Sequence, residues 1–305
     1  MKNAPRTFVW WLLIGCGLLA SMVVLGGYLT ATGTTSQLPG QAVGRRVVLS
    51  ALFSGLATGG CLYPVLVNLH RRVFRFADDV VTGNLELASV MGAAVSQRDS
   101  GTGDHNFRVT LYAFHLAEAL EAPDLDMRAL MLGAFLHDVG KIGIPDALLL
   151  KPGPLSTEEM AVMRTHVDLG VKIIGTSKWL QLARSVIENH HERFDGSGYP
   201  RGLAGMAIPL EARIFSIVDG FDALTSERPY KRALPLAEAL ACLQKAVGSQ
   251  FDPALVAAFS RIAGKAYDAV HLATEPEMRD LLTALVERHR LVLYDARPVS
   301  PSVFK

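Results

Sequence analysis

Five of the nine histidines lie in short polar segments at the ends of apolar stretches. With the aspartates beside them, these segments hold seven candidate metal ligands: His105, His137, Asp138, His166, His190, His191 and Asp219. Neutral imidazoles and carboxylates suit iron, manganese or zinc, and one aspartate can bridge two cations through its two oxygens. The set therefore supplies enough ligands for two metal ions.

Two of these segments contain adjacent pairs of ligand-type residues, His137 with Asp138 and His190 with His191. A single histidine on a helix is more often a packed or hydrogen-bonded residue than a ligand. Neighbours on a helix point about 100° apart, so both members of a pair reach one cavity only at the flank of the helix. Burying them without partners would be costly, and metal coordination removes that cost. The pairs therefore favour a metal centre.

Such a centre would suit the hydrolysis of a phosphodiester. Two cations can provide a strong nucleophile at neutral pH and neutralise the charge that grows on the phosphoryl oxygens. Lys141 follows Asp138 by about one helical turn and is placed to meet a phosphate oxygen or the leaving group. The alternative for Lys141 is a solvated cation at the end of a helix, favoured by the helix dipole.

Longer motifs surround the candidate ligands. They are His137-Asp-Val-Gly-Lys-Ile-Gly-Ile-Pro-Asp146, Lys151-Pro-Gly153, His190-His-Glu-Arg-Phe-Asp-Gly-Ser-Gly-Tyr-Pro200, Asp222-Ala-Leu-Thr-Ser226, Arg228-Pro-Tyr-Lys231 and Phe251-Asp-Pro253. Over residues 95–262 the sequence resembles the HD-GYP phosphodiesterases, a branch of the HD metallohydrolase superfamily. The resemblance implies an all-helical domain that hydrolyses cyclic di-GMP to linear pGpG and/or GMP; some members act on cyclic GMP-AMP.

The resemblance also implies how the ligands divide. His105, His137, Asp138 and Asp219 would hold one divalent ion, iron or manganese, and Asp138 would bridge to a second held by His166, His190 and His191. Some members bind a third ion through a glutamate one helical turn before the first histidine. This chain has Gly101 at that position, so two ions are expected here. Asp138 and Lys141 would be the catalytic residues.

Substrate contacts are expected from Tyr199, Arg228 and Lys231. Tyr199 lies in a glycine-rich turn, residues 196–200, whose bare backbone can approach a ligand closely. In the family this loop is implicated in contacts with diguanylate cyclases. Arg228 and Lys231 would face the phosphates or a guanine edge, or they form an ordinary basic pair on the surface.

Two other functions compete with hydrolysis of a cyclic dinucleotide. A catalytically silent receptor would bind the nucleotide or a partner protein, but silent relatives usually lack part of the histidine–aspartate set, which is complete here. A hydrolase for mononucleotides or guanosine tetraphosphate is disfavoured by the second group of histidines and by Tyr199-Pro200.

The elements that position these residues are predicted to be helices. Residues 99–270 read as an all-α bundle of the HD type. Ser156 and Glu159 form a capping box, and three prolines fit first helical turns: Pro209, Pro235 and Pro253. Three glycines are predicted to stop helices: Gly140, Gly170 and Gly248. Residues 271–305 contain an amphipathic helix, 278–286, and a Pro/Ser tail to which no role is assigned.

Residues 1–67 are expected to anchor the chain in the bacterial inner membrane. Two uncharged runs, 8–28 and 47–67, are each 21 residues long, enough to cross about 30 Å of hydrocarbon. Basic residues before the first run and after the second place both ends, and the catalytic domain, in the cytoplasm. The loop 29–46 is too short for a sensor domain. A cleaved signal peptide is the alternative for the first run, but its length and the closeness of the second run weigh against it.

Residues 68–98 are predicted to form a linking helix. Its apolar positions follow 4–3 spacing: Leu69, Val73, Phe76, Val80, Leu87, Val90 and Ala94, with Gly83 at one weak position. The pattern fits a parallel coiled coil that joins two subunits, or equally an amphipathic helix packed on its own domain. A homodimer is the expectation, and Gly55 with Gly59 could bring two copies together.

Composition narrows the remaining classes. A net charge of +1 with 19% charged residues gives no basic field for nucleic acid, which is therefore not an expected partner. The three cysteines are far apart, so neither a disulfide framework nor a thiolate metal site is indicated.

Overall fold

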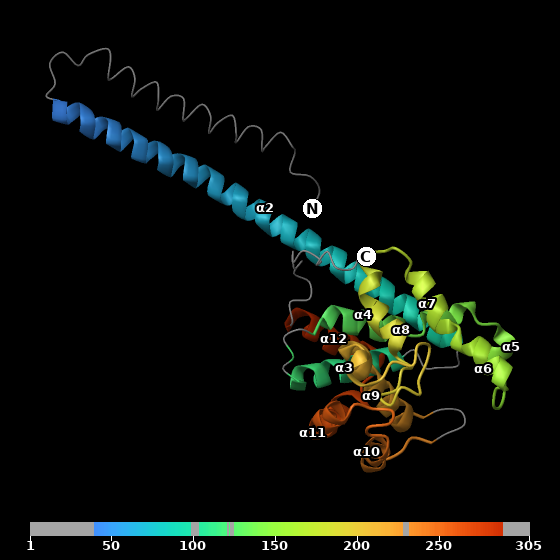
Figure 1. Cartoon of the computed structure of the whole chain (residues 1–305). Helices are drawn as coiled ribbons and strands as arrows, with labels where there is room; N and C mark the ends of the chain where they lie inside the picture. Colours follow the sequence, from blue (N-terminus) through green and yellow to red (C-terminus); the bar gives the residue numbers. More distant parts are fainter. Residues whose placement is uncertain (1–39, 99–103, 121, 123–124, 228–231, 289–305) are drawn as a thin grey trace. The chain divides into compact units, whose positions relative to one another are not determined.

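The computed structural model describes residues 40–98, 104–120, 122, 125–227 and 232–288. These residues form helices joined by turns, with no β-strand among them and only two isolated bridges, Asp195–Ala204 and Val247–Phe251. The chain divides into two compact units, Met1–Ala77 and Asp78–Lys305. The prediction of an all-α fold is confirmed (Figure 1).

The first described element is the long helix α2, Gly40–Arg98, which contains Pro64. The predicted second span, 47–67, and the predicted linking helix, 68–98, therefore belong to one continuous helix. In the part of the chain that the structure describes, no helix is both long and apolar enough to cross a membrane. The predicted first span, 8–28, lies outside the described residues.

The second unit is built around α3, Asp104–Leu120, which packs against four other helices. These are α4 (Met127–Leu136), α9 (Leu210–Thr225), α11 (Pro253–Val270) and α12 (Glu275–Arg288). Aromatic side chains fill the centre: Tyr112 and Phe259 both lie edge-on to Phe221, with centroids 5.2 and 4.9 Å apart. Burial of such rings contributes roughly 2 kcal/mol each, so this core holds the site-bearing helices in place.

Shorter elements complete the unit. They are the 3₁₀ helices η2 (Val139–Gly143), η3 (Leu180–Ala183) and η4 (Gly205–Ala207), and the helices α5 (Asp146–Leu149), α6 (Thr157–Arg164), α7 (His166–Ile174), α8 (Arg184–Asn189) and α10 (Leu236–Lys245). The capping box at the start of α6 is confirmed, with both Ser156 and Glu159 hydrogen bonds present. Pro253 begins α11 as predicted, whereas Pro209 and Pro235 stand one residue before their helices.

The prediction that Gly140 and Gly170 stop helices is wrong. Gly140 lies inside η2 and Gly170 lies inside α7. A Cβ on Gly140 would overlap the carbonyl oxygen of His166 and the amide nitrogen of Gly170. Gly140 therefore serves close packing between η2 and α7, and Gly170 allows α7 to pack against Ile187 of α8. Neither role can be distinguished from a helix stop in the sequence.

The C-terminal helix α12 belongs to the same core. Met278, Leu285 and Val286 are buried, and the Arg288 guanidinium lies 3.2 Å from the Glu118 carboxylate of α3. Helical packing in this unit thus continues beyond residue 270, and the predicted amphipathic helix 278–286 lies within α12.

The last turns of α2 also pack on this unit. Ala88, Ser89 and Val95 are buried, whereas Leu87 and Val90 are 56% and 63% exposed. The helix therefore contacts its own domain through a different face from the one that carries the 4–3 positions.

Candidate metal centre

Six elements bring the predicted ligands together. His137 follows α4, Asp138 precedes η2, His166 begins α7, His190 and His191 follow α8, Asp219 lies within α9, and His105 lies within α3. They form two groups: Asp138 with His166, His190 and His191, and His105 with His137 and Asp219. Within each group, one ligand atom from each residue lies within 4.8 Å of the others, close enough for a metal ion.

Asp138 lies between the groups. Its Oδ1 is 3.5 Å from His166 Nε2 and 3.9 Å from His190 Nε2, while its Oδ2 is 3.1 Å from His137 Nε2. In the other group, His105 Nε2 is 3.5 Å from Asp219 Oδ1. The two oxygens of one carboxylate thus face histidines of both groups.

The hydrogen bonds of three of these histidines show that their Nε2 atoms can bind a cation. The Nδ1 atoms of His137, His166 and His190 lie 2.9, 2.8 and 3.0 Å from backbone carbonyl oxygens, to which they donate hydrogen bonds. A neutral ring that donates from Nδ1 leaves Nε2 as a lone-pair acceptor. His166 Nε2 and His190 Nε2 then face each other at 3.4 Å. Two converging acceptors are satisfied by a cation between them.

Electrostatics keep three of these imidazoles neutral. Burial lowers the pKa of His166, lowers that of His190 strongly, and lowers that of His191 to about 3. For His137, burial acts in the same direction, but the charge of Asp138, the hydrogen bond to it, the charge of Asp219 and the Ala134 carbonyl together outweigh burial, and the pKa is raised. Burial would raise the pKa of Asp138, yet the charges of Lys141 and His137 hold it well below its usual range. The three neutral imidazoles beside the Asp138 carboxylate are the ligand forms that a divalent cation requires.

Sequence reasoning missed the partner of His105. Asp222, one turn after Asp219 on α9, is buried, and its Oδ2 lies 2.7 Å from His105 Nδ1. Arg108 donates to both Asp222 oxygens, at 2.6 and 3.1 Å. A ligand histidine commonly donates its second N–H to a carboxylate, which fixes the ring. The spacing of Asp219 and Asp222, three residues apart on one helix, was the sequence signal that could have identified this partner.

Replacing Asp222 with asparagine is expected to weaken divalent-metal affinity by about 10- to 100-fold. The uncharged amide cannot balance the positive charge of Arg108. Its NH₂ group is a donor and would face another donor, either Arg108 or the N–H of His105. A Mn²⁺ titration of the full chain measures the effect. Asp268→Asn on the exposed side of α11 is the matched control, and equal affinities for the two variants would contradict this role.

Lys141 contacts the site directly, with its Nζ 2.8 Å from Asp138 Oδ2. The ammonium group therefore neutralises the central carboxylate. A phosphate bound beside Asp138 would lie within reach of the same group.

The 196–200 turn packs against His191. The Tyr199 ring stacks on the His191 ring, with centroids 4.6 Å apart. The buried carboxylate of Glu192 accepts hydrogen bonds from the amides of Arg201 and Leu203, which fixes the turn. A Cβ on Gly198 would lie 2.6 Å from both the His191 carbonyl oxygen and the Glu192 Cα, so only glycine allows this approach.

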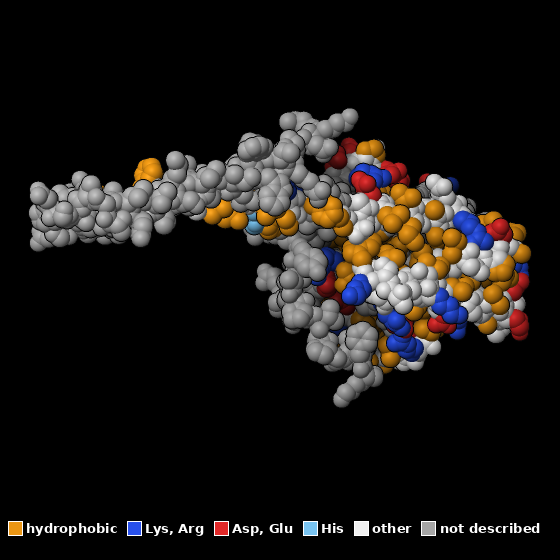
Figure 2. All heavy atoms as spheres, turned by 90° about the horizontal axis from the view of Figure 1, so that it is seen from above, with side chains coloured by type: hydrophobic (Ala, Val, Ile, Leu, Met, Phe, Trp, Pro, Cys, Tyr) orange, Lys and Arg blue, Asp and Glu red, His pale blue; other side chains and the backbone are white. Residues whose placement is uncertain are grey.

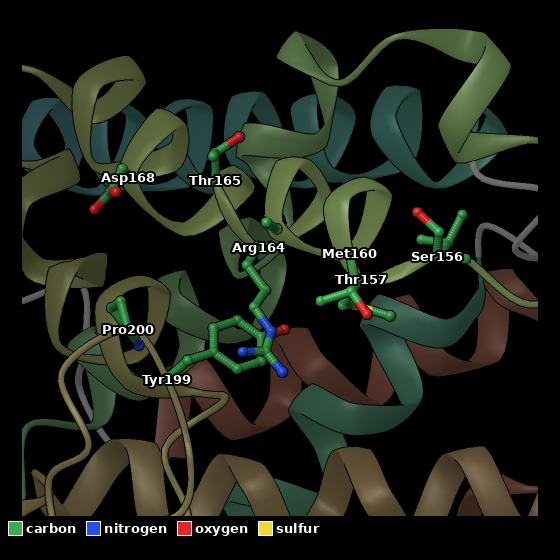
Figure 3. Close-up of a pocket in the computed structure, with 10 residues that line it drawn as sticks. Ser156, Thr157, Met160, Arg164, Thr165, Asp168, Tyr199 and Pro200 are labelled. Atoms are coloured by element: carbon green, nitrogen blue, oxygen red, sulfur yellow. The ribbon is translucent and has the colours of Figure 1, made fainter.

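A cavity of about 640 Å³ opens on the side of Tyr199 and Pro200, lined by residues of α6 and the start of α7. In Figure 3 the Arg164 guanidinium lies over the Tyr199 ring, 4.7 Å from its centroid. Thr165 and Asp168 add polar groups to the wall. Arg164 was not singled out from the sequence. The predicted substrate residues Arg228 and Lys231 lie outside the described residues.

Residues 89–255 match the HD-domain family, and the chain belongs to that family. The match covers every candidate ligand in the two groups.

Several curated proteins are similar to this chain. The cyclic di-GMP phosphodiesterase response regulator RpfG of Xanthomonas campestris is 42% identical over 197 residues, 64% of this chain and 52% of its own. A cyclic di-GMP phosphodiesterase of Thermotoga maritima is 39% identical over 58% of this chain and 49% of its own. The 3'3'-cGAMP-specific phosphodiesterase 2 of Vibrio cholerae is 40% identical over 56% of this chain and 33% of its own length. The chain thus spans from a third to about half the length of these relatives.

Proposed function

We propose that this chain is a metal-dependent phosphodiesterase that hydrolyses cyclic di-GMP to pGpG and/or GMP. The observation that carries the proposal is the convergence of imidazole Nε2 atoms on the two oxygens of Asp138. The similarity to phosphodiesterases of cyclic di-GMP and of 3'3'-cGAMP supports a cyclic dinucleotide as the substrate class.

In this proposal two divalent ions, iron or manganese, occupy the two groups. His105, His137 and Asp219 hold one ion, His166, His190 and His191 hold the other, and Asp138 serves both. Bound there, the ions would activate water and neutralise charge on the phosphoryl oxygens. Asp138 sets the negative charge that attracts them, and Lys141 offers a proton or a positive charge to the leaving oxygen.

The cavity beside Tyr199 is proposed to hold the part of the dinucleotide that is not being cleaved. Arg164 would pair with its second phosphate or lie against a guanine face, since a guanidinium suits both. Tyr199 already contacts His191 and Arg164, so its ring would shape the wall of the cavity. Arg228 and Lys231 remain proposed as further substrate contacts.

Replacing Arg164 with alanine is expected to raise KM for cyclic di-GMP by about tenfold, because a charge-assisted contact contributes roughly 1.5 kcal/mol. The value of kcat should change by less than about threefold, since Arg164 lies outside the ligand groups. Steady-state kinetics separate the two constants. Lys178→Ala, at an exposed position before η3, is the control, and a matching change in its KM would remove Arg164 from the substrate site.

The direct test of the function incubates the full chain, loaded with Mn²⁺ or anaerobically with Fe²⁺, with cyclic di-GMP and separately with 3'3'-cGAMP. Products are identified by chromatography and metal content is measured in parallel. Formation of pGpG or GMP supports the proposal. Binding of cyclic di-GMP without turnover, at about two metal ions per chain, would favour the receptor alternative. If only 3'3'-cGAMP were hydrolysed, cyclic di-GMP would be the wrong substrate and 3'3'-cGAMP would take its place in the proposal.

We further propose that residues 1–67 attach the chain to the inner membrane, with the catalytic domain in the cytoplasm.

We also propose that two copies of the chain dimerise through α2. The 4–3 positions Leu69, Val73, Phe76, Leu87 and Val90 are all more than half exposed, and Figure 2 shows hydrophobic side chains gathered along the described part of α2. A parallel pair of such helices would bury them. The 196–200 turn is proposed to contact diguanylate cyclases. A monomeric mass for the detergent-solubilised chain would contradict the dimer.

A further inference from the structure

The side chain of the last residue of α2 binds the backbone next to the candidate metal centre. Arg98 Nη1 donates to the carbonyl oxygens of Lys141 and Ile142, at 2.9 and 2.8 Å. Its Nη2 donates to the carbonyl oxygen of Ile144, at 2.7 Å, and its Nε donates to Asp146 Oδ1, at 2.8 Å. One guanidinium thus donates to three carbonyl groups at and just after the C-terminal end of η2, and the Lys141 carbonyl oxygen also accepts from the Ile144 amide at 3.0 Å.

This contact reaches Asp138 through Lys141. The backbone amide of Lys141 donates to the Asp138 carbonyl oxygen at 2.9 Å, and its Nζ lies 2.8 Å from the Asp138 carboxylate. The same residue therefore accepts a hydrogen bond from Arg98 and pairs with the central carboxylate. A shift of Arg98 would move the backbone from which Lys141 extends.

Two more contacts join the same end of α2 to residues beside candidate ligands. A Cβ on Gly92 would overlap the carbonyl oxygen of Phe135, two residues before His137. Ser96 Oγ accepts a hydrogen bond from Asn106 Nδ2 at 3.3 Å, next to His105. Residues 92–98 of α2 thus touch the chain beside three candidate ligands.

We infer that Arg98 is a positioning residue that holds η2, and with it Asp138 and Lys141, in the geometry needed for metal binding and hydrolysis. The inference rests on the proposed function for its kinetic part only. Metal affinity tests it independently. The carbonyl contacts carry the effect in this account, because Asp146 is largely exposed and a surface ion pair contributes little.

The test compares Arg98→Lys with Asp146→Asn in the full chain. Lysine keeps the charge but cannot direct a planar fork of donors at three carbonyl groups. We expect Arg98→Lys to weaken Mn²⁺ affinity by about tenfold and to lower kcat by about tenfold with KM changed less than twofold. Asp146→Asn should change each by less than about threefold. Arg184→Lys, an exposed arginine paired with Glu188, is the matched control.

Wild-type Mn²⁺ affinity in Arg98→Lys would overturn the inference, as would a lower melting temperature with affinity and kcat unchanged. Equal losses in Arg98→Lys and Asp146→Asn would also overturn it, since the ion pair would then be responsible. If the wild-type chain hydrolyses no cyclic dinucleotide, the proposed function fails, while the Mn²⁺ titrations still decide the role of Arg98.

Discussion

Replacing Asp138 with alanine is expected to reduce phosphodiesterase turnover by at least about 10³-fold. Its two oxygens face histidines of both ligand groups, so one substitution removes a ligand from each proposed ion. Loss of several kcal/mol of metal-assisted stabilisation corresponds to this factor. Bound Mn²⁺ should fall at the same time, as measured by metal analysis after gel filtration.

Asp280→Ala provides the matched control for this variant. Asp280 is an exposed aspartate on α12, outside both ligand groups, and its replacement should leave turnover and metal content unchanged. If Asp138→Ala kept wild-type turnover with full metal content, the proposed centre would be wrong. Lost turnover with full metal content would instead leave Asp138 a catalytic role but remove it as a metal ligand.

Replacing Gly140 with alanine is expected to lower the free energy of unfolding by about 3 kcal/mol or more. The added Cβ would overlap the His166 carbonyl oxygen and the Gly170 amide, both backbone atoms that cannot rotate away. Overpacking of this kind typically costs 1–3 kcal/mol, and more where backbone must move. Urea denaturation monitored by circular dichroism measures the change. Because His166 would shift with its carbonyl group, metal affinity should fall as well.

Gly264→Ala is the matched control for Gly140→Ala. Gly264 lies within α11, and a Cβ there would meet no atom within 4 Å. Alanine is favoured over glycine inside a helix, so this variant should be more stable by about 0.5–1 kcal/mol. If both variants changed stability equally, the packing role of Gly140 would be refuted.

The sequence predicted the helical fold and the residues that gather at the centre, because those residues stand in motifs with fixed spacing. His137 with Asp138 and His190 with His191 are neighbours in the chain, so any fold that brings one member to the site brings the other. Helix starts were predictable where the cap is local, as at Ser156 and Glu159.

Contacts between distant segments could not be read in the same way. The pairing of Asp222 with His105 joins residues 117 apart, and that of Arg98 with Lys141 joins residues 43 apart. Gly170 was misread because a close approach between two helices and a helix end both favour glycine. The continuity of α2 across residue 67 also escaped prediction, since no local signal separates two adjoining helices from a single one.

The two faces of α2 have a consequence for how this chain could be joined to other modules. Ala88 and Val95 fix the rotational phase of the last turns of α2 against their own domain, and Leu87 and Val90 on the same turns then have a fixed phase too. Each inserted residue turns everything upstream by about 100°, whereas seven residues nearly restore the original direction. In a helix continued upstream into another module, insertions of seven or eleven residues would therefore nearly preserve alignment, whereas insertions of one or two residues would not. A helix that continues these last turns would therefore act as a phase-sensitive connector, whose length decides the direction in which a preceding module faces.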